Sequence, residues 1–217
     1  MKTRYKVAAA AFIIAVLAAC QPSPPAPTTG TWVNDPNGPG EKVAVLGDSQ
    51  ITQNLSLWTT GALAGDGPLA IWAVAGSQYS DSGAWGKNLS PDPDVALIAQ
   101  GANNAYPLFG LDGWTRDDEL DLWRLVNYLR QGGVTCILVS TIGYPATAPL
   151  PQRQHADIAS AFIRSWAAQA DNPDVWVWDW QAESQGQPWF GGNQLHVNPA
   201  GAAAHAASGR AAVQGCP

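Results

Sequence analysis

The chain is poor in positive charge, in cysteine and in charged residues generally. Lysine and arginine number 11 against 17 acidic residues, and only 13% of the 217 residues are charged. This deficit of basic residues argues against a nucleic-acid partner. Cysteine and histidine each occur three times, and no pair has the spacing of metal ligands. We therefore expect neither a metal nor another cofactor.

Long hydrophobic runs are also missing, except at the N-terminus. Residues 7–19 are apolar, follow a basic start and are too few to span a bilayer comfortably. The run ends in Leu-Ala-Ala-Cys at 17–20, which resembles the bacterial lipoprotein signal and implies lipid attachment at Cys20. A plain secretory signal with an incidental cysteine is the alternative. We expect residues 1–19 to be a signal peptide, and the mature protein to be anchored on the extracytoplasmic face of the cell membrane without crossing it.

A spacer and one folded domain follow the signal. Residues 20–38 contain the lipidated cysteine and a segment rich in proline and threonine, which predicts an extended, semi-rigid spacer. Residues 39–217 are enough for one domain with a substantial core, and we expect a monomer. Cleavage of the signal removes three basic residues, which leaves eight against 17 acids and a net charge of −9.

Two cysteines remain after Cys20. Cys136 lies in an apolar strand pattern, and Cys216 lies one residue from the C-terminus. In an exported protein these two can pair, and a disulfide would then fix the tail to the sheet. Two unpaired cysteines are the other interpretation.

Short apolar segments alternate with helical patterns along the domain. The predicted strands are 42–46, 69–74, 95–99, 134–141 and 174–179. The predicted helices are 51–64, 115–131, 152–170 and 199–213. This alternation predicts a parallel sheet covered by helices on both faces, with the functional site beyond the carboxyl ends of the strands.

Two of these helices have clear local patterns. Thr115 with Asp118 predicts a capping box at the start of the second helix, ahead of a stripe of leucines and a valine. The third helix carries an apolar stripe formed by Ile158, Phe162 and Trp166. We expect each stripe to face the core.

Residues with complementary chemistry stand at the ends of three strands and before the last helix. Ser49 follows the first strand in Gly-Asp-Ser, where it is either a turn or cap residue or a nucleophile. Gly76 follows the second strand and allows close approach to its backbone N–H, and Asn103 follows the third with a side-chain amide. His196 precedes the last helix, so it can serve as a general base at the same edge.

These four blocks, in this order, resemble the SGNH or GDSL hydrolases, and the resemblance covers essentially the whole domain. It implies a flavodoxin-like three-layer α/β/α sandwich with about five parallel strands. It also implies Ser49 as the nucleophile and His196 as the base. The oxyanion hole would comprise the N–H groups of Ser49 and Gly76 and the side chain of Asn103.

The sequence departs from this family at two positions. Asn193 stands where the family usually has the triad aspartate, three residues before the histidine, and Asn104 replaces another usual aspartate. An amide oxygen can orient a histidine, so Asn193 can complete a Ser–His–Asn triad. A backbone carbonyl in that role would leave a Ser–His dyad. Asp179, after the fifth strand, is a substitute acid, although a turn cap is its more usual role.

Three further polar residues are given structural roles. We expect Asp48 to hold the turn at Ser49 by hydrogen bonds. His155 shares the stripe of the third helix and is expected to be partly buried, whereas His205 is expected at the surface of the last helix.

Together these features predict an exported, lipid-anchored serine hydrolase. It would cleave carboxylic esters, such as short acyl or acetyl esters on carbohydrate, through an acyl-enzyme. The alternative is a catalytically weakened domain of the same fold that binds cell-surface carbohydrate.

Overall fold

A computed structural model of the protein describes residues 32–62, 67–82, 85, 88–106, 112–192 and 195–217. Five parallel strands form a sheet in the order β2-β1-β3-β4-β5. They are β1 (Val43–Gly47), β2 (Leu69–Ala73), β3 (Val95–Ala99), β4 (Cys136–Ser140) and β5 (Val175–Trp178). The predicted α/β sandwich is therefore confirmed. Cys20, the predicted lipid-attachment residue, and Asn193 lie outside the described residues.

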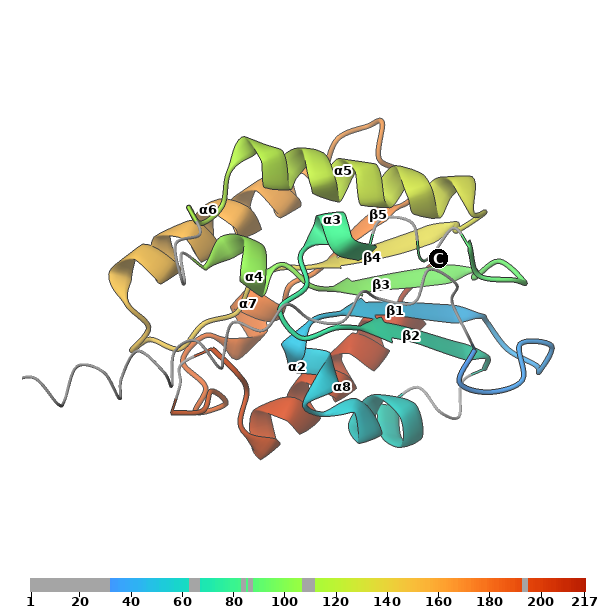
Figure 1. Ribbon diagram of the computed structural model, residues 1–217, viewed down its shortest axis with the longest axis horizontal. Coiled ribbons are helices and arrows are strands. Elements are labelled where there is room, and N and C mark those ends of the chain that lie inside the picture. Colours follow the sequence, from blue (N-terminus) through green and yellow to red (C-terminus); the bar gives the residue numbers. More distant parts are fainter. Residues whose placement is uncertain (1–31, 63–66, 83–84, 86–87, 107–111, 193–194) are drawn as a thin grey trace, which may run out of the picture.

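Helices cover both faces of the sheet, and α5 and α6 lie on the face opposite α8 (Figure 1). The helices are α2 (Ser49–Thr52), the π-helix η2 (Leu57–Ala62), α3 (Tyr79–Ser82), α4 (Ala102–Ala105), α5 (Arg116–Gln131), α6 (Leu150–Ala167), α7 (Trp180–Ser184) and α8 (Pro199–Gln214). Among the described residues, none of these helices has both the length and the hydropathy to cross a bilayer.

Alternate strand residues face the two helical layers. Leu46 and Ile98 pack in the core beneath α5 and α6, whereas Val45 and Leu97 pack in the core beneath α8. Because both faces are covered, every residue of β1, β3 and β4 is buried. This explains why these strands read as continuous apolar runs.

The start of α5 has the predicted capping box. The backbone N–H and hydroxyl of Thr115 both donate to Asp118 Oδ2, each over 2.8 Å. The expected leucine and valine stripe of this helix is buried. Local sequence was sufficient here because the cap and the buried stripe lie in the same sixteen-residue helix.

Two predicted helical features are wrong. The helix expected over 51–64 is interrupted after Thr52, where the Asn54 side chain donates to the Gln50 carbonyl and competes with helix continuation. In α6, Ile158 is exposed instead of buried. The face of α6 turned toward the sheet consists mainly of small side chains such as Ala156 and Ser160. A stripe of large apolar residues therefore does not mark this face.

His205 is also placed differently from the prediction, in the core under α8. It is only 4% exposed and lies among the rings of Trp58, Trp178 and Trp180. The small residues of α8 allow this packing: a Cβ added to Gly209 would lie 2.6 Å from the Trp58 ring. An alanine-rich helix thus approaches the sheet closely, and its one large ring fills the interior.

The C-terminal tail is covalently fixed to the sheet. Cys136 on β4 and Cys216 form a disulfide that spans 80 residues. A cross-link over so long a segment restricts the unfolded chain strongly.

We expect Cys216→Ser to lower the free energy of unfolding by about 2–4 kcal/mol, because the unfolded chain regains this freedom. Urea unfolding of the oxidised wild type and the variant measures the loss. The wild type with its disulfide reduced should unfold at nearly the same urea concentration as the variant. A variant as stable as the oxidised wild type would contradict the expectation.

Candidate active site

Ser49 and His196 meet at the carboxyl edge of the sheet. Ser49 is the first residue of α2, directly after β1, and His196 lies just before α8. Their side chains are in hydrogen-bond contact, with 2.9 Å between Ser49 Oγ and His196 Nε2. This is the geometry in which a histidine can take the proton of a serine hydroxyl.

Asp48 holds the turn at Ser49 from beneath. Its Oδ1 atom accepts from the backbone N–H of Gln50 over 2.9 Å, and its carboxylate also accepts from the N–H of Ala102. Asp48 is 1% exposed. Burial disfavours its charged form more than these hydrogen bonds favour it, so its pKa is raised to about 7. Its position supports the predicted role in shaping the turn.

Gly76 and Asn103 lie on neighbouring loops that are tied together. Gly76 has φ of 81°, a conformation that favours glycine, in the loop after β2. Asn103 in α4 donates from Nδ2 to the carbonyl of Ser77 over 3.0 Å, and its second amide hydrogen has no acceptor among the described residues. Ser77 Oγ in turn donates to the carbonyl of Gly47 at the end of β1. The loops after β1, β2 and β3 are therefore joined by direct hydrogen bonds.

Asn104, at the second departure from the family pattern, has a structural role. Its Oδ1 accepts from the N–H of Tyr79, and its Nδ2 donates to Asp118 over 2.6 Å. It therefore links α4 to α3 and to the capping box of α5. An amide suits this position because it donates and accepts at once, which an ionised carboxylate cannot do.

His196 lies between α7 and α8 on the second of two paired stretches, residues 189–192 and 195–198, which we call the hairpin. An antiparallel bridge pairs Phe190 with Val197, and the N–H of Gly191 donates to the carbonyl of His196 over 2.7 Å. Trp189, at the base of the hairpin, stacks on Trp180 with 5.5 Å between the ring centroids. The hairpin therefore rests on the aromatic core. Burial lowers the pKa of His196, which favours the neutral form that a base requires.

Sequence reasoning missed Gln50, which contacts this hairpin from α2. Its Nε2 donates to the carbonyl of Leu195 over 2.6 Å, and its Oε1 accepts from the N–H of Val197 over 3.2 Å. The only available signal was a polar residue next to Ser49. Nothing in the sequence paired it with a segment about 145 residues away.

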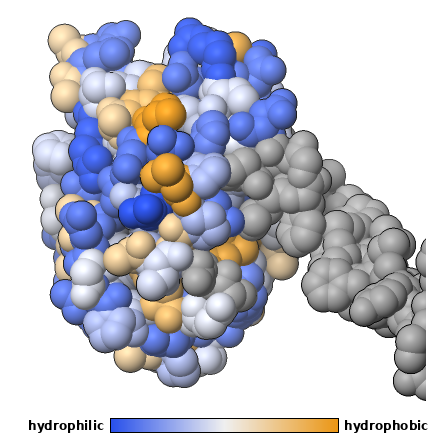
Figure 2. Space-filling model, turned by 90° about the vertical axis from the view of Figure 1, so that its left-hand side faces the viewer, coloured by the Kyte–Doolittle hydropathy of each residue, from blue (hydrophilic) through white to orange (hydrophobic). Residues whose placement is uncertain are grey.

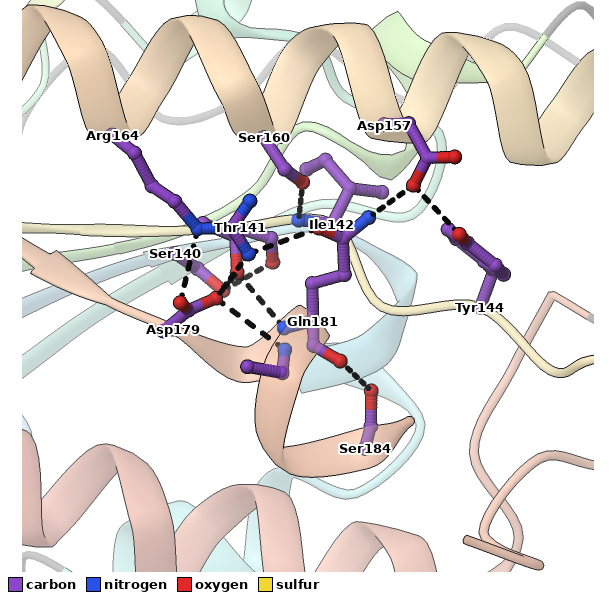
Figure 3. A network of polar contacts seen from close by, with 11 residues as sticks. Ser140, Thr141, Ile142, Tyr144, Asp157, Ser160, Arg164, Asp179, Gln181 and Ser184 are labelled. Carbon is purple, nitrogen blue, oxygen red and sulfur yellow. Dashed lines mark hydrogen bonds and ion pairs between the residues drawn. The ribbon is translucent and has the colours of Figure 1, made fainter. Parts of the chain in front are cut away.

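Asp179 is a cap and a salt-bridge partner, as its more usual role predicted. It caps α7 and accepts from Thr141, Ala182 and Arg164, whose Nη2 lies 2.6 Å from Oδ1 (Figure 3). Burial opposes ionisation of Asp179, but these donors outweigh it and hold its pKa below the ordinary value. Among the described residues its bonds go to this network and not to His196, so Asp179 does not act as the acid beside the histidine.

The last histidine, His155, lies on α6, away from the other site residues in the sequence. His155 is half-buried, with its ring against Gly113. In the part of the chain that the structure describes, no three His, Cys, Asp or Glu side chains form a group able to hold a metal ion.

The carboxyl ends of the strands, with α2, α4 and α7, lie on the left of Figure 1. Figure 2 shows this face, where a few hydrophobic side chains gather within a largely hydrophilic surface.

Beneath the turn at Ser49, Asp48 and His205 line one small cavity of about 20 Å³. Burial lowers the pKa of His205 to about 3, opposite to its effect on Asp48.

These two shifts predict opposite pH effects on stability. Because the pKa of Asp48 is raised to about 7, Asp48 contributes to the free energy of unfolding when it is protonated. This contribution is complete below about pH 4 and is lost as pH rises to 7. Because the pKa of His205 is lowered to about 3, keeping His205 buried and neutral lowers the free energy of unfolding increasingly as pH falls below 6.5. In the wild type the two effects offset each other between pH 4 and 6.5.

We therefore expect the single variants to diverge from the wild type on acidification. From pH 7.5 to pH 5, His205→Phe should gain stability relative to the wild type and Asp48→Asn should lose it, each by up to about 1.4 kcal/mol per pH unit. Urea unfolding of all three proteins at both pH values measures this. Parallel stability curves would show that neither group titrates as described.

No family model matches the sequence, and no curated protein matches it. Solved structures do match. The catalytic domain of a peptidoglycan O-acetyltransferase from Streptococcus pneumoniae, with a methylsulfonyl adduct, is 20% identical with a TM-score of 0.59, over 82% of this chain and 92% of that one. An acetyl xylan esterase from Geobacillus stearothermophilus is 18% identical with a TM-score of 0.60, over 78% and 92%.

A proposed acylhydrolase from Bacteroides fragilis is 15% identical with a TM-score of 0.64, over 97% of this chain and 98% of that one. A lipase described as GDSL-like, from Bacteroides thetaiotaomicron, has a TM-score of 0.59 at 16% identity, over 80% and 88%. At these identities the similarity establishes the architecture. The chain has the α/β sandwich fold of the SGNH hydrolases.

Proposed function

We propose that the protein is a serine hydrolase that cleaves carboxylic esters. The observation that carries the proposal is the 2.9 Å contact between Ser49 Oγ and His196 Nε2 at the carboxyl edge of the sheet. Two structural neighbours are named as acetyl xylan esterases and one as a peptidoglycan O-acetyltransferase, which supports acyl chemistry on this fold.

Acylation begins with proton transfer from Ser49 to His196 Nε2. Ser49 Oγ attacks the ester carbonyl, whose oxygen becomes negatively charged. The N–H groups of Ser49 and Gly76 and the free amide hydrogen of Asn103 donate to that oxygen. Within the described residues, the backbone N–H groups of Ser49 and Gly76 donate to no other protein atom. The intermediate then collapses, His196 returns its proton to the leaving alcohol, and the acyl group remains on Ser49.

Deacylation repeats these steps with water. His196 takes a proton from water as the water oxygen attacks the acyl carbonyl, and the same donors stabilise the oxyanion. Collapse returns the proton to Ser49 Oγ and releases the carboxylic acid. We assign Asn193 as the third member of a Ser–His–Asn triad, since an amide oxygen can orient the histidine ring.

Acetyl or other short acyl esters on carbohydrate are the substrates that we propose. The acetyl xylan esterase neighbours support this class, and so does the predicted export of the chain. We place the enzyme on the extracytoplasmic face of a bacterial membrane, held by a lipid on Cys20 and a spacer. The spacer is shorter than the predicted 20–38, because Trp32 already pairs with Ala70 of β2 and packs against the core. A monomer is sufficient, because the proposed roles all fall within one chain.

Ser49→Ala should lower the rate of p-nitrophenyl acetate hydrolysis at least about 10³-fold, because no other group replaces the nucleophile. His196→Ala should cost a similar factor, and the double variant should lose little more, since the two act as a unit. Steady-state rates and labelling by a fluorophosphonate probe measure these effects.

Equal rates for the wild type and Ser49→Ala would contradict the proposal. A native protein that resists the probe but binds acetylated xylooligosaccharide would instead favour the alternative, a carbohydrate-binding domain on the same fold. Hydrolysis of acetylated xylooligosaccharide beside p-nitrophenyl acetate tests the carbohydrate assignment separately.

The pH profile follows from the lowered pKa of His196. The base acts only when neutral, and burial keeps it neutral to lower pH than an exposed histidine. The rising limb of kcat/KM should therefore have its midpoint below 6.5, with full activity at neutral pH. Initial rates from pH 4 to 9 measure the midpoint, and a value above 6.5 would show that the ring is not held as described.

A further inference from the structure

We propose that Gln50 is a positioning residue that fixes the catalytic base against the nucleophile. The inference rests on the proposed function. Gln50 makes two hydrogen bonds, to the carbonyl of Leu195 over 2.6 Å and from the N–H of Val197 over 3.2 Å. These are the peptide groups on either side of His196, so one side chain holds the backbone both before and after the base.

Two bonds from one amide constrain more than either bond alone. A single hydrogen bond would let the peptide pivot about it, whereas a pair from Nε2 and Oε1 sets both the position and the orientation of the segment. Catalytic groups lose efficiency with displacements of about 1 Å, so this degree of constraint matters for proton transfer.

The location of Gln50 makes the constraint relevant to catalysis. Gln50 directly follows Ser49 in α2, and its own backbone N–H is held by Asp48. The hairpin is internally paired through Phe190 and Val197, but those bonds set only its own shape. Gln50 adds two hydrogen bonds between the hairpin and α2. These bonds fix the position of the base relative to the turn that carries the nucleophile.

Glutamine suits this task better than its closest replacements. Methionine has similar length but forms neither bond. Glutamate, when ionised, can accept from the N–H of Val197, but its other oxygen then faces the carbonyl of Leu195. Protonated glutamic acid can donate to that carbonyl and accept from Val197 together, as glutamine does.

The test uses Gln50→Met and Gln50→Glu, with Gln53→Met as a matched control. Gln53 is exposed at the end of the same helix, and its side chain makes no hydrogen bond within the described residues. Gln50→Met should lose at least tenfold in kcat on p-nitrophenyl acetate, with KM within twofold. Gln50→Glu should lose activity relative to the wild type progressively as pH rises to 8.5, because its carboxyl then loses the proton that it can donate to the carbonyl of Leu195.

A second measurement is independent of activity. The amide hydrogen of Val197, bonded to Gln50 Oε1, should exchange at least tenfold faster in Gln50→Met than in the wild type or in Gln53→Met. An active wild type with kcat in Gln50→Met equal to that of Gln53→Met would overturn the positioning role. An inactive wild type would instead refute the proposed function, and the exchange of Val197 would still decide whether the contact exists.

Discussion

The hydrogen bond between Ser49 and His196 joins residues 147 positions apart, and most of the structure serves to make that contact possible. β1 lies inside the sheet, between β2 and β3, so the turn at its end cannot shift without disturbing both neighbours. The hairpin with His196 reaches the same edge because α8 packs against the core beneath β1 and β3. The fold thus supplies a fixed turn on one side and a supported hairpin on the other.

Carboxylates at this edge support the scaffold. Asp118 binds Asn104 and Thr115, and Asp179 binds Arg164 and Thr141. Asp48 supports the turn at Ser49 from a buried position. Each of these acids accepts hydrogen bonds from the loop or helix start that it stabilises. The proposed use of Asn193, a neutral side chain, beside His196 accords with these structural roles of the acids.

Local patterns in the sequence were sufficient for the strands and for the capped helix. Each predicted strand lies within two residues of the observed one, because a strand covered on both faces must be apolar throughout. The four- and five-residue helices α3, α4 and α7 were missed, since so few residues show no periodicity. The exposed Ile158 and the buried His205 were misplaced because the small residues around them, rather than their own character, decide how closely each helix approaches the sheet.

The candidate site divides in the same way. Ser49, Gly76, Asn103 and His196 could be named as candidates because each stands at a strand end or a helix start, and their proposed roles came from the resemblance to the SGNH hydrolases. Gln50 was not recognisable, because its partners are backbone groups of Leu195 and Val197, and any sequence there would offer the same carbonyl and N–H. Candidates for the reacting groups of such a site can be named from residue type, topology and family resemblance. The contacts that align them depend on backbone geometry and emerge only from the folded structure.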